Sequence, residues 1–433
     1  MLEEGLQKLK EKKILDSLNI FNKLNKLYPN NSDILFCLGN VYYELNDLNK
    51  SLFYFEQSYK THPNSEVIIN NYAVTMQSLG RIKEAKKFFY KLIEINPENI
   101  KAYYRLFRMN VDILKNYSIK KLKNFENKKE ISLEDKSLIN YILSKYEKNN
   151  NNIKKEIQFL NKAHEYNFKS RVKYNSRLSY FYINILSQYY DKFQFLSKLQ
   201  KYNQSSKLKP IFIIGLPRSG STIIESLLSQ NNEKFYSFGE CGIFHNSIFN
   251  QIKNKPFNEK SKIEINGKEL IESLKYVYDY SKKKNFIDKS LENFFYIDLI
   301  LKIFPNAKFI HTFRNKSDAA IAIYQSMLIY LPWAHSIKNI LDYILNYEKI
   351  ISHFNAKYSK KILNLNFEDF TSNPETSSKK IFDFCDLEWN ENALNFYNKN
   401  ISSKSSSFLQ IRKKIQKYDN EKYKSYYYLI KNN

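Results

Sequence analysis

Residues 210–222 read PIFIIGLPRSGST, and residues 223–228 continue as IIESLL. The first segment begins with an apolar run rich in β-branched and aromatic residues, which is typical of a buried strand in a parallel sheet. The second repeats its apolar residues at helical spacing. Two glycines, Gly215 and Gly220, bound the loop between them. This order predicts an anion site, because free backbone N–H groups and the positive end of the helix dipole converge at such a loop.

The loop departs from the Walker A pattern, G-x-x-x-x-G-K-[ST], at one position. Gly215, Gly220 and Thr222 match the pattern, but Ser221 replaces the lysine that contacts the β- and γ-phosphates of a nucleoside triphosphate. Arg218 instead offers a planar guanidinium that suits a terminal phosphate. The loop therefore favours a phosphate ligand over triphosphate hydrolysis, and a strand–turn–helix junction without a ligand is the alternative.

Residues 217–222 resemble the loop with which sulfotransferases bind the 5′-phosphate of 3′-phosphoadenosine 5′-phosphosulfate, whose pattern is P-R-S-G-[ST]-T. The resemblance extends over roughly the second half of the chain. It implies this co-substrate, no metal, and a binding residue at each matching position: Pro217, Arg218, Ser219, Gly220, Ser221 and Thr222. Because Arg218 would supply the main positive charge that binds the 5′-phosphate, it is also expected to take part in catalysis.

A glycine-flanked loop after the first helix carries the candidate base. Residues 238–242, FGECG, resemble the G-E-E loop of the tyrosylprotein sulfotransferases, which implies that Glu240 removes the proton of the acceptor hydroxyl. Cys241 takes the position of the family's second acid. His245, the base in other branches of the family, is the second choice, and a solvated surface glutamate is the alternative to both.

Two further predicted strands end next to basic residues. Residues 285–290, NFIDKS, resemble an element whose lysine contacts the bridging oxygen of the phosphosulfate, which implies that Lys289 neutralises the leaving phosphate. A solvated strand-end lysine is the alternative. Residues 307–314, AKFIHTFR, resemble the family's 3′-phosphate element and place Arg314 at its arginine. Because Gly215 and these two basic residues all follow strands, the ligand is expected at the carboxyl edge of the sheet.

The resemblance to the 3′-phosphate element is incomplete. In the helix expected from Asp318 to Leu328, Ala322 replaces the family's serine, and Lys316 replaces the proline before it. We expect either that Lys316 or Ser317 compensates for these differences or that 3′-phosphate binding is weaker than in the family.

The last part of the chain resembles two more elements of the family. Residues 363–375 match its V-x-Y-E-x-[LF]-x-x-[DN]-P-E segment, with Phe367 in place of the tyrosine. Residues 405–414, SSSFLQIRKK, resemble the segment that closes over the co-substrate, which implies that Gln410 and Lys413 bind it. A flexible basic tail is the alternative for the latter segment.

The first half of the chain carries a different signal, a repeat. Pro29, Pro63 and Pro97 are spaced by the tetratricopeptide period. The consensus packing positions of two copies are filled by Leu38, Gly39, Tyr42 and Phe55 and by Tyr72, Ala73, Ala85 and Phe89. The first copy keeps only its second helix and is expected to be incomplete, and a fourth copy begins at Lys101 and loses the pattern.

These observations predict an α + α/β protein with three parts. Residues 1–130 form tetratricopeptide-type helical repeats, and residues 131–206 form an irregular helical extension and linker, with a polar break at 149–152. Residues 207–433 form a P-loop-like α/β sulfotransferase domain with a mostly parallel sheet. The repeat surface is expected to bind a peptide or protein acceptor. The alternative is a lid or a dimerisation arm, which makes a homodimer a further expectation.

Composition sets few limits on function. The 433 residues include Lys+Arg 69 against Asp+Glu 44, and the net charge of +25 suits an anionic ligand, nucleic acid or a membrane surface. No recognised nucleic-acid motif occurs, and the longest uncharged run, 319–334, is too short to span a bilayer. The three cysteines lack disulfide or zinc spacing, and no signal peptide is visible. We therefore expect a cytoplasmic protein that binds neither nucleic acid nor membrane.

The function expected from the sequence is transfer of a sulfuryl group from 3′-phosphoadenosine 5′-phosphosulfate to a hydroxyl. The resemblance to the tyrosylprotein type makes a peptide tyrosine the first expectation, ahead of a sugar or a small molecule. Two alternatives remain open. One is a P-loop kinase or NTPase, and the other is a non-catalytic tetratricopeptide scaffold with a vestigial nucleotide site.

Overall fold

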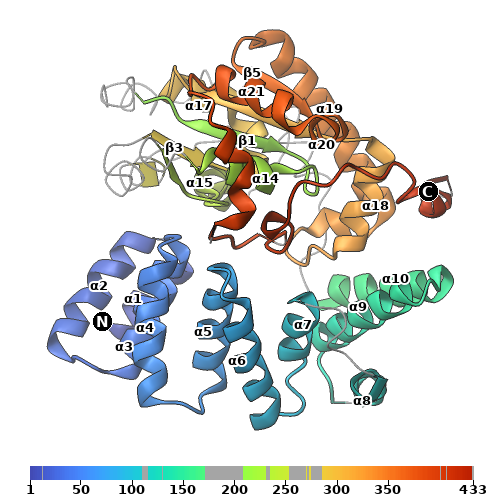
Figure 1. Ribbon diagram of the computed structural model, residues 1–433. Helices are drawn as coiled ribbons and strands as arrows, with labels where there is room; N and C mark the ends of the chain where they lie inside the picture. Colours follow the sequence, from blue (N-terminus) through green and yellow to red (C-terminus); the bar gives the residue numbers. More distant parts are fainter. Residues whose placement is uncertain are drawn as a thin grey trace. The chain divides into compact units, whose positions relative to one another are not determined.

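The computed structural model describes residues 1–11, 13–109, 116–128, 130–170, 208–230, 235–252, 270, 273–274, 285–399, 401–405 and 407–431. They fall into two compact units (Figure 1). One unit is Met1–Tyr174 with Tyr324–Ser336, and the other is Asn175–Ile323 with Ile337–Asn433. Residues 171–206 of the predicted helical extension and linker lie outside the described residues. No helix in the described ranges has both the length and the apolar character needed to cross a membrane.

The first unit is helical. Its described helices are α1 (Leu2–Lys10), α2 (Ile14–Leu27), α3 (Ser32–Glu44), α4 (Leu48–Thr61), α5 (Glu66–Ser78), α6 (Ile82–Ile95), α7 (Ile100–Met109), α8 (Asn116–Glu126), α9 (Leu133–Asn149), α10 (Ile153–Ser170) and the short 3₁₀ helix η6 (Pro332–His335). The three spaced prolines lie in the turns after α2, α4 and α6, as the repeat predicts.

The predicted packing of the repeat is confirmed at its turns and at its small residues. Asn46 and Gly80 form the turns inside two helix pairs with positive φ angles of 61° and 85°. Gly39 of α3 lies so close to α4 that an added Cβ would be 2.6 Å from the Phe55 ring. A small residue is therefore required there, because the two helices touch at that point.

The expectation of an incomplete first copy was wrong. Helix α1 supplies the missing first helix, and an added Cβ at Gly5 would lie 2.7 Å from the Phe21 ring of α2. Ser17 Oγ donates to the Gly5 carbonyl at 2.9 Å, and Ser51 Oγ makes the same bond to the Gly39 carbonyl at 2.9 Å. The first helix pair thus repeats the contacts of the second. Its first helix, α1, is short and rich in charged residues, so the repeat pattern is not visible there in the sequence.

The polar break at 149–152 separates α9 from α10, as predicted. Helix α10 contributes His164 to a buried network with residues of the segment 324–336. His164 Nε2 donates to the Tyr324 carbonyl at 3.0 Å, so its Nδ1 accepts from His335 Nδ1 at 2.8 Å. His335 Nε2 then accepts from Asn167 Nδ2 at 2.8 Å. These three hydrogen bonds can all form only when the imidazoles of His164 and His335 are both neutral.

Acid should therefore destabilise the fold before the carboxylates titrate. Burial, together with the neighbouring His335, holds the pKa of His164 well below its usual value, and burial lowers the pKa of both His245 and His311 to about 4. The unfolded chain binds these protons near pH 6.5, so stability is complete above that pH and falls as the pH drops toward 4. Protonation of His245 and of His311 should each lower the free energy of unfolding by about 3 kcal/mol at the acid end of this range.

Denaturant midpoints measured between about pH 7.5 and about pH 4.5 test this expectation. Replacing buried His164 by leucine should flatten the pH dependence, whereas replacing exposed His62 by glutamine should leave it unchanged. A midpoint that does not move over this range would contradict the neutral histidines.

The second unit is built on a parallel sheet, as predicted. Its strands lie in the order β2-β3-β1-β4-β5, and neighbouring strands pair in parallel register. The strands are β1 (Ile211–Gly215), β2 (Phe235–Ser237), β3 (Asn285–Asp288), β4 (Lys308–Phe313) and β5 (Ile362–Asn366). The sequence did not predict β2, which is too short to show a pattern.

The described helices of this unit cover the sheet and extend from it (Figure 1). They are α14 (Ser221–Leu228), α15 (Ile243–Ile252), η5 (Leu291–Tyr296), α17 (Ile297–Ile303), α18 (Lys316–Ser326, whose last residues belong to the first unit), α19 (Ile337–Lys357), α20 (Phe367–Ser372), α21 (Pro374–Phe384), η7 (Glu391–Asn398), η8 (Gln410–Arg412), η9 (Lys424–Tyr426) and α22 (Tyr428–Lys431). Successive side chains of β1 point to opposite faces of the sheet. Ile213 packs in a cluster with Leu227 of α14, whereas Phe212 stacks on Phe309 with ring centroids 5.4 Å apart.

The topology places the candidate site between β1 and β4. From β1 the chain continues toward β2 on one side of the sheet, and from β4 it continues toward β5 on the other. Ligands of open α/β sheets bind outside the carboxyl ends of the strands at such a switch point. Gly215 ends β1 there, directly beside Thr312 of β4.

Gly215→Ala should destabilise the α/β unit by about 3 kcal/mol or more. Gly215 has φ +143°, and an added Cβ would lie 2.2 Å from the Thr312 carbonyl oxygen, a backbone atom that the sheet fixes. Gly242→Ala is a matched control, because it also has a positive φ, of +60°, but its Cβ would meet only the mobile end of Asn246 at 3.0 Å. Chemical denaturation of both variants measures the difference, and equal losses would contradict the steric account.

Candidate active site

A cavity of about 450 Å³ lies among the segments that follow β1 and β4. Its volume is within the range of small-molecule sites. The sequence-predicted residues that line it are Pro217, Arg218, Gly220, Ser221, Thr222, Glu240, Arg314, Gln410 and Lys413. Residues from the loop after β1, the loop after β2, the end of β4 and the C-terminal segment thus meet around one space.

Ser219 and Lys289 are not among the lining residues, although the sequence placed both in the site. Ser219 is buried, and its Oγ donates to the Leu216 carbonyl at 2.6 Å and lies 2.9 Å from Thr312 Oγ1. Its side chain therefore holds the shape of the loop. Lys289 is also buried, and it reaches the cavity wall only through Glu240.

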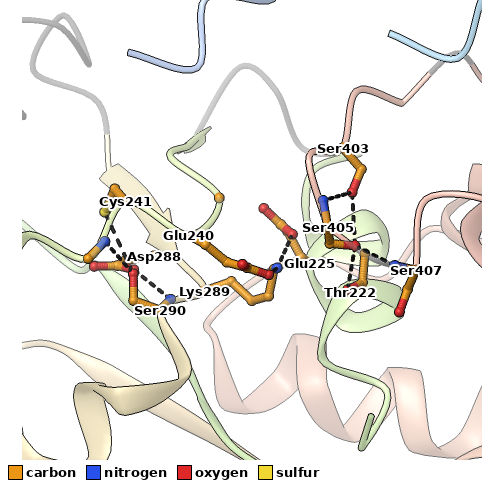
Figure 2. A network of polar contacts seen from close by, with 12 residues as sticks. Thr222, Glu225, Glu240, Cys241, Asp288, Lys289, Ser290, Ser403, Ser405 and Ser407 are labelled. Carbon is orange, nitrogen blue, oxygen red and sulfur yellow. Dashed lines mark hydrogen bonds and ion pairs between the residues drawn. The ribbon is translucent and has the colours of Figure 1, made fainter. Parts of the chain in front are cut away.

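The loop after β1 needs glycine where the second predicted glycine occurs. Gly220 is the N-cap of α14 with φ +89°, and an added Cβ would lie 2.4 Å from the Phe367 ring. Arg218 donates from Nη1 to Ser407 Oγ at 2.6 Å. Thr222 Oγ1 donates to Ser405 Oγ at 3.2 Å (Figure 2). The C-terminal segment is therefore bound to the phosphate loop. Ser406 lies outside the described residues.

Lys289 lies between two carboxylates. Its Nζ donates to Glu240 Oε1 and lies 3.6 Å from Glu225 Oε2 of α14 (Figure 2). Burial alone would lower the pKa of Lys289, but the two carboxylates outweigh it, and its pKa is raised above the usual value. The Lys289 side chain is 2% exposed, and those of Glu225 and Glu240 are 14% and 56% exposed. A buried, charged ammonium thus stands directly behind an accessible carboxylate.

Backbone bonds fix the loop that carries Glu240 to the end of β3. The Lys289 N–H donates to the Gly239 carbonyl at 2.9 Å, and the Gly242 N–H donates to Ser290 Oγ at 2.7 Å. Burial, with the adjacent Asp288, raises the pKa of the Cys241 thiol well above its usual value. Cys241 therefore holds its proton and is no nucleophile at neutral pH.

His245, the second candidate base, has a different environment. It lies in the first turn of α15, five residues after Glu240, but it does not line the cavity. Its Nδ1 lies 3.2 Å from the Tyr296 hydroxyl, and burial lowers its pKa to about 4. Of the two candidate bases, Glu240 therefore lines the cavity and His245 does not.

Arg314 lines the cavity, but aromatic residues surround its guanidinium. The centre of the guanidinium lies 4.6 Å from the Tyr418 ring centroid, 5.3 Å from that of Tyr423 and 5.6 Å from that of Phe367. Its two terminal nitrogens donate to the Arg218 carbonyl, at 3.1 Å, and to the Tyr418 hydroxyl. Its Nε is buried and has no partner among the described residues.

Of the residues suggested as substitutes for the missing family serine, neither Lys316 nor Ser317 lines the cavity. Lys316 Nζ donates to Glu348 at 2.9 Å, and Ala322, at the position of the serine, is buried in α18. Instead, Tyr418 and Tyr427 donate their hydroxyls to the Asp318 carboxylate at 2.5 and 2.6 Å. The first turn of α18 is therefore tied to the C-terminal segment.

Sequence reasoning missed Glu225, Tyr418 and Tyr423. Glu225 did carry a signal, since it is the one charged residue in the apolar helix segment 223–228. The two tyrosines carried none, because the chain holds 35 tyrosines and the C-terminal segment is full of them.

Comparison with known proteins finds similarities in both halves of the chain. A model described as the sulfotransferase family matches residues 210–391, and a tetratricopeptide-repeat model matches residues 68–99. An uncharacterized protein of Aquifex aeolicus is 26% identical over 368 residues, which are 81% of this chain and 47% of that relative, so the chain spans about half of the relative's length.

Two more similarities concern single parts of the chain. A peroxisomal targeting signal receptor of Saccharomyces cerevisiae is 26% identical over 96 residues, which are 22% of this chain and 15% of the receptor. The solved sulfotransferase domain of the olefin synthase of Synechococcus PCC 7002 is 18% identical, covers 50% of this chain and 89% of its own, and superposes with a TM-score of 0.36. By the two family models, residues 210–391 are similar to the sulfotransferase family, and the same chain carries a match to tetratricopeptide repeats.

Proposed function

We propose that the protein transfers a sulfuryl group from 3′-phosphoadenosine 5′-phosphosulfate to an acceptor hydroxyl. One observation carries the proposal: Arg218, Arg314 and Glu240 line a single cavity, and the ammonium of Lys289 stands behind Glu240. The sequence predicts complementary roles for these four residues, and they come together from four separate segments.

The residues present suit the co-substrate. Phosphate groups need cations and N–H donors, and the cavity supplies Arg218, Arg314 and the N-terminal turn of α14. The buried Arg314 Nε lacks a partner among the described residues, as expected of a donor reserved for a ligand. Arg218 and the loop would hold the 5′-phosphate, and Arg314 would hold the 3′-phosphate. When bound, the co-substrate supplies an activated sulfuryl group.

The chain's own residues would then handle one proton and one developing charge. An oxygen–sulfur bond forms to the acceptor, the bond between sulfur and the bridging phosphate oxygen breaks, and adenosine 3′,5′-bisphosphate leaves. Glu240 takes the acceptor's hydroxyl proton, and the positive charge of Lys289, behind Glu240, offsets the charge that grows on the bridging oxygen. The products are a sulfate ester and the bisphosphate.

For the acceptor we propose a tyrosine hydroxyl of a peptide or protein. Support comes from the resemblance of residues 238–242 to the tyrosylprotein sulfotransferases and from the exposure of the Glu240 side chain to the cavity. We further propose that the repeat helices bind the protein that carries the acceptor. Tetratricopeptide repeats are binding surfaces, and α1 to α6 make three complete pairs.

Isothermal titration with three ligands tests the donor site. Adenosine 3′,5′-bisphosphate should bind at least about tenfold more tightly than adenosine 5′-monophosphate and than ATP with magnesium. Arg314→Met should remove the preference over the monophosphate, because a charge-assisted bond to the 3′-phosphate is worth about 1.5–3 kcal/mol. Tighter binding of ATP with magnesium would favour a kinase or NTPase, and no binding of any ligand would favour a scaffold.

A further inference from the structure

The two carboxylates on Lys289 are not equivalent. Glu240 belongs to a loop and lines the cavity, whereas Glu225 belongs to α14 and does not. Glu225 is also fixed from its other side, because Ser237 Oγ at the end of β2 donates to its Oε1 at 2.7 Å. Lys289 thus has one accessible partner in the cavity and one partner held within the fold.

In the proposed reaction, the accessible partner, Glu240, is a counter-ion of Lys289 for only part of the cycle. Once Glu240 has accepted the acceptor's proton, it no longer carries the charge that balances Lys289. A buried ammonium without a counter-ion is costly, and removal of one partner from a buried pair typically costs about 3–5 kcal/mol. Glu225 remains charged at 3.6 Å and in the same position, so the ammonium stays paired.

Glu225 also connects Lys289 to the phosphate loop. It follows Thr222 by three residues in α14, and residues at this spacing lie on the same side of a helix. Thr222 lines the cavity, so one short helix positions both a phosphate-binding residue and the counter-ion of Lys289.

We propose that Glu225 is a positioning residue that keeps Lys289 charged and in place behind the cavity wall while Glu240 serves as the base. This inference rests on the proposed sulfuryl transfer. It goes beyond it by separating the two carboxylates, one for proton transfer and one for holding the lysine.

Glu225→Gln tests the charge alone, because glutamine keeps the size of the side chain and can still accept from Ser237. The variant should lower kcat by about 10- to 100-fold, with the KM for the donor changed by less than about threefold. The alkaline limb of the pH–rate profile, where Lys289 loses its proton, should move to lower pH by about one unit or more. Glu225→Asp keeps the charge and should restore that limb even if kcat stays low. Glu375→Gln, on a surface carboxylate paired with Lys379, is the matched control and should change neither quantity.

A readout without turnover keeps this inference separate from the proposed function. NMR of the lysine side chains can follow the protonation of Lys289 beside that of exposed Lys379, without any reagent that must reach the buried amine. Glu225→Gln should lower the pKa of Lys289 by about one unit or more and leave that of Lys379 unchanged. An unchanged pKa of Lys289 or an unchanged alkaline limb overturns the role of Glu225. Failure of the wild-type protein to bind adenosine 3′,5′-bisphosphate overturns the sulfuryl transfer instead, whatever the pKa of Lys289 shows.

Discussion

Glu240→Gln should lower kcat for sulfuryl transfer by about 10²–10⁴-fold, the usual contribution of a general base. Glutamine keeps the shape and the hydrogen bonding of the side chain but cannot accept the proton. Glu240 is well placed for that step, since it lines the cavity and its side chain is 56% exposed. Binding of adenosine 3′,5′-bisphosphate should change by less than about threefold, because the phosphates are held by other residues.

His245→Asn is the matched control, because it removes the other candidate base. Its side chain is bonded to Tyr296 and does not line the cavity, so this variant should keep kcat within about tenfold of the wild type. Turnover measured as labelled sulfate ester, together with bisphosphate titration, separates the two. A fully active Glu240→Gln variant, or a larger loss in His245→Asn, would assign the base elsewhere.

The parts of the site that could be predicted from the sequence are contiguous in the chain. A strand, a glycine loop and a helix within residues 211–228 contain their own geometry, because the apolar pattern sets the two elements and the glycines set the turn. The same holds for β3 and β4, each with a basic residue just after it. The rule that parallel strands end at one edge then brings these residues together without any knowledge of side-chain contacts.

The parts that could not be predicted depend on contacts between distant segments. Nothing near Lys289 in the sequence indicates that Glu225 is its partner, and nothing near Arg314 indicates that Tyr418 covers it. Such pairs are set by how helices dock on the sheet, and the residue types are too common in this chain to stand out. The first helix of the first repeat could not be predicted for another reason. Gly5 is its only residue that matches the repeat, and one small residue does not make a pattern.

Lys289→Met should lower kcat by about 10²–10³-fold, the typical cost of removing one group that stabilises developing charge. Methionine fills a similar volume, and the fold should survive because burying an ammonium carries a desolvation cost that its removal relieves. The two carboxylates it leaves behind are 14% and 56% exposed, so water or protons can compensate for the lost partner. Circular dichroism and bisphosphate titration show whether the variant is folded and binds, and turnover then measures the chemistry.

The double variant Lys289→Met with Glu240→Gln decides whether the two residues act as one unit. Their ion pair in the free protein means that each sets the charge state and the position of the other. Residues of such a unit show strongly non-additive losses, so the double variant should be about as slow as the slower single variant. Losses that multiply would instead show a lysine and a base working independently. In that case the ion pair would be a feature of the resting protein alone, and the charge on Lys289 would not need Glu225 to maintain it during the reaction.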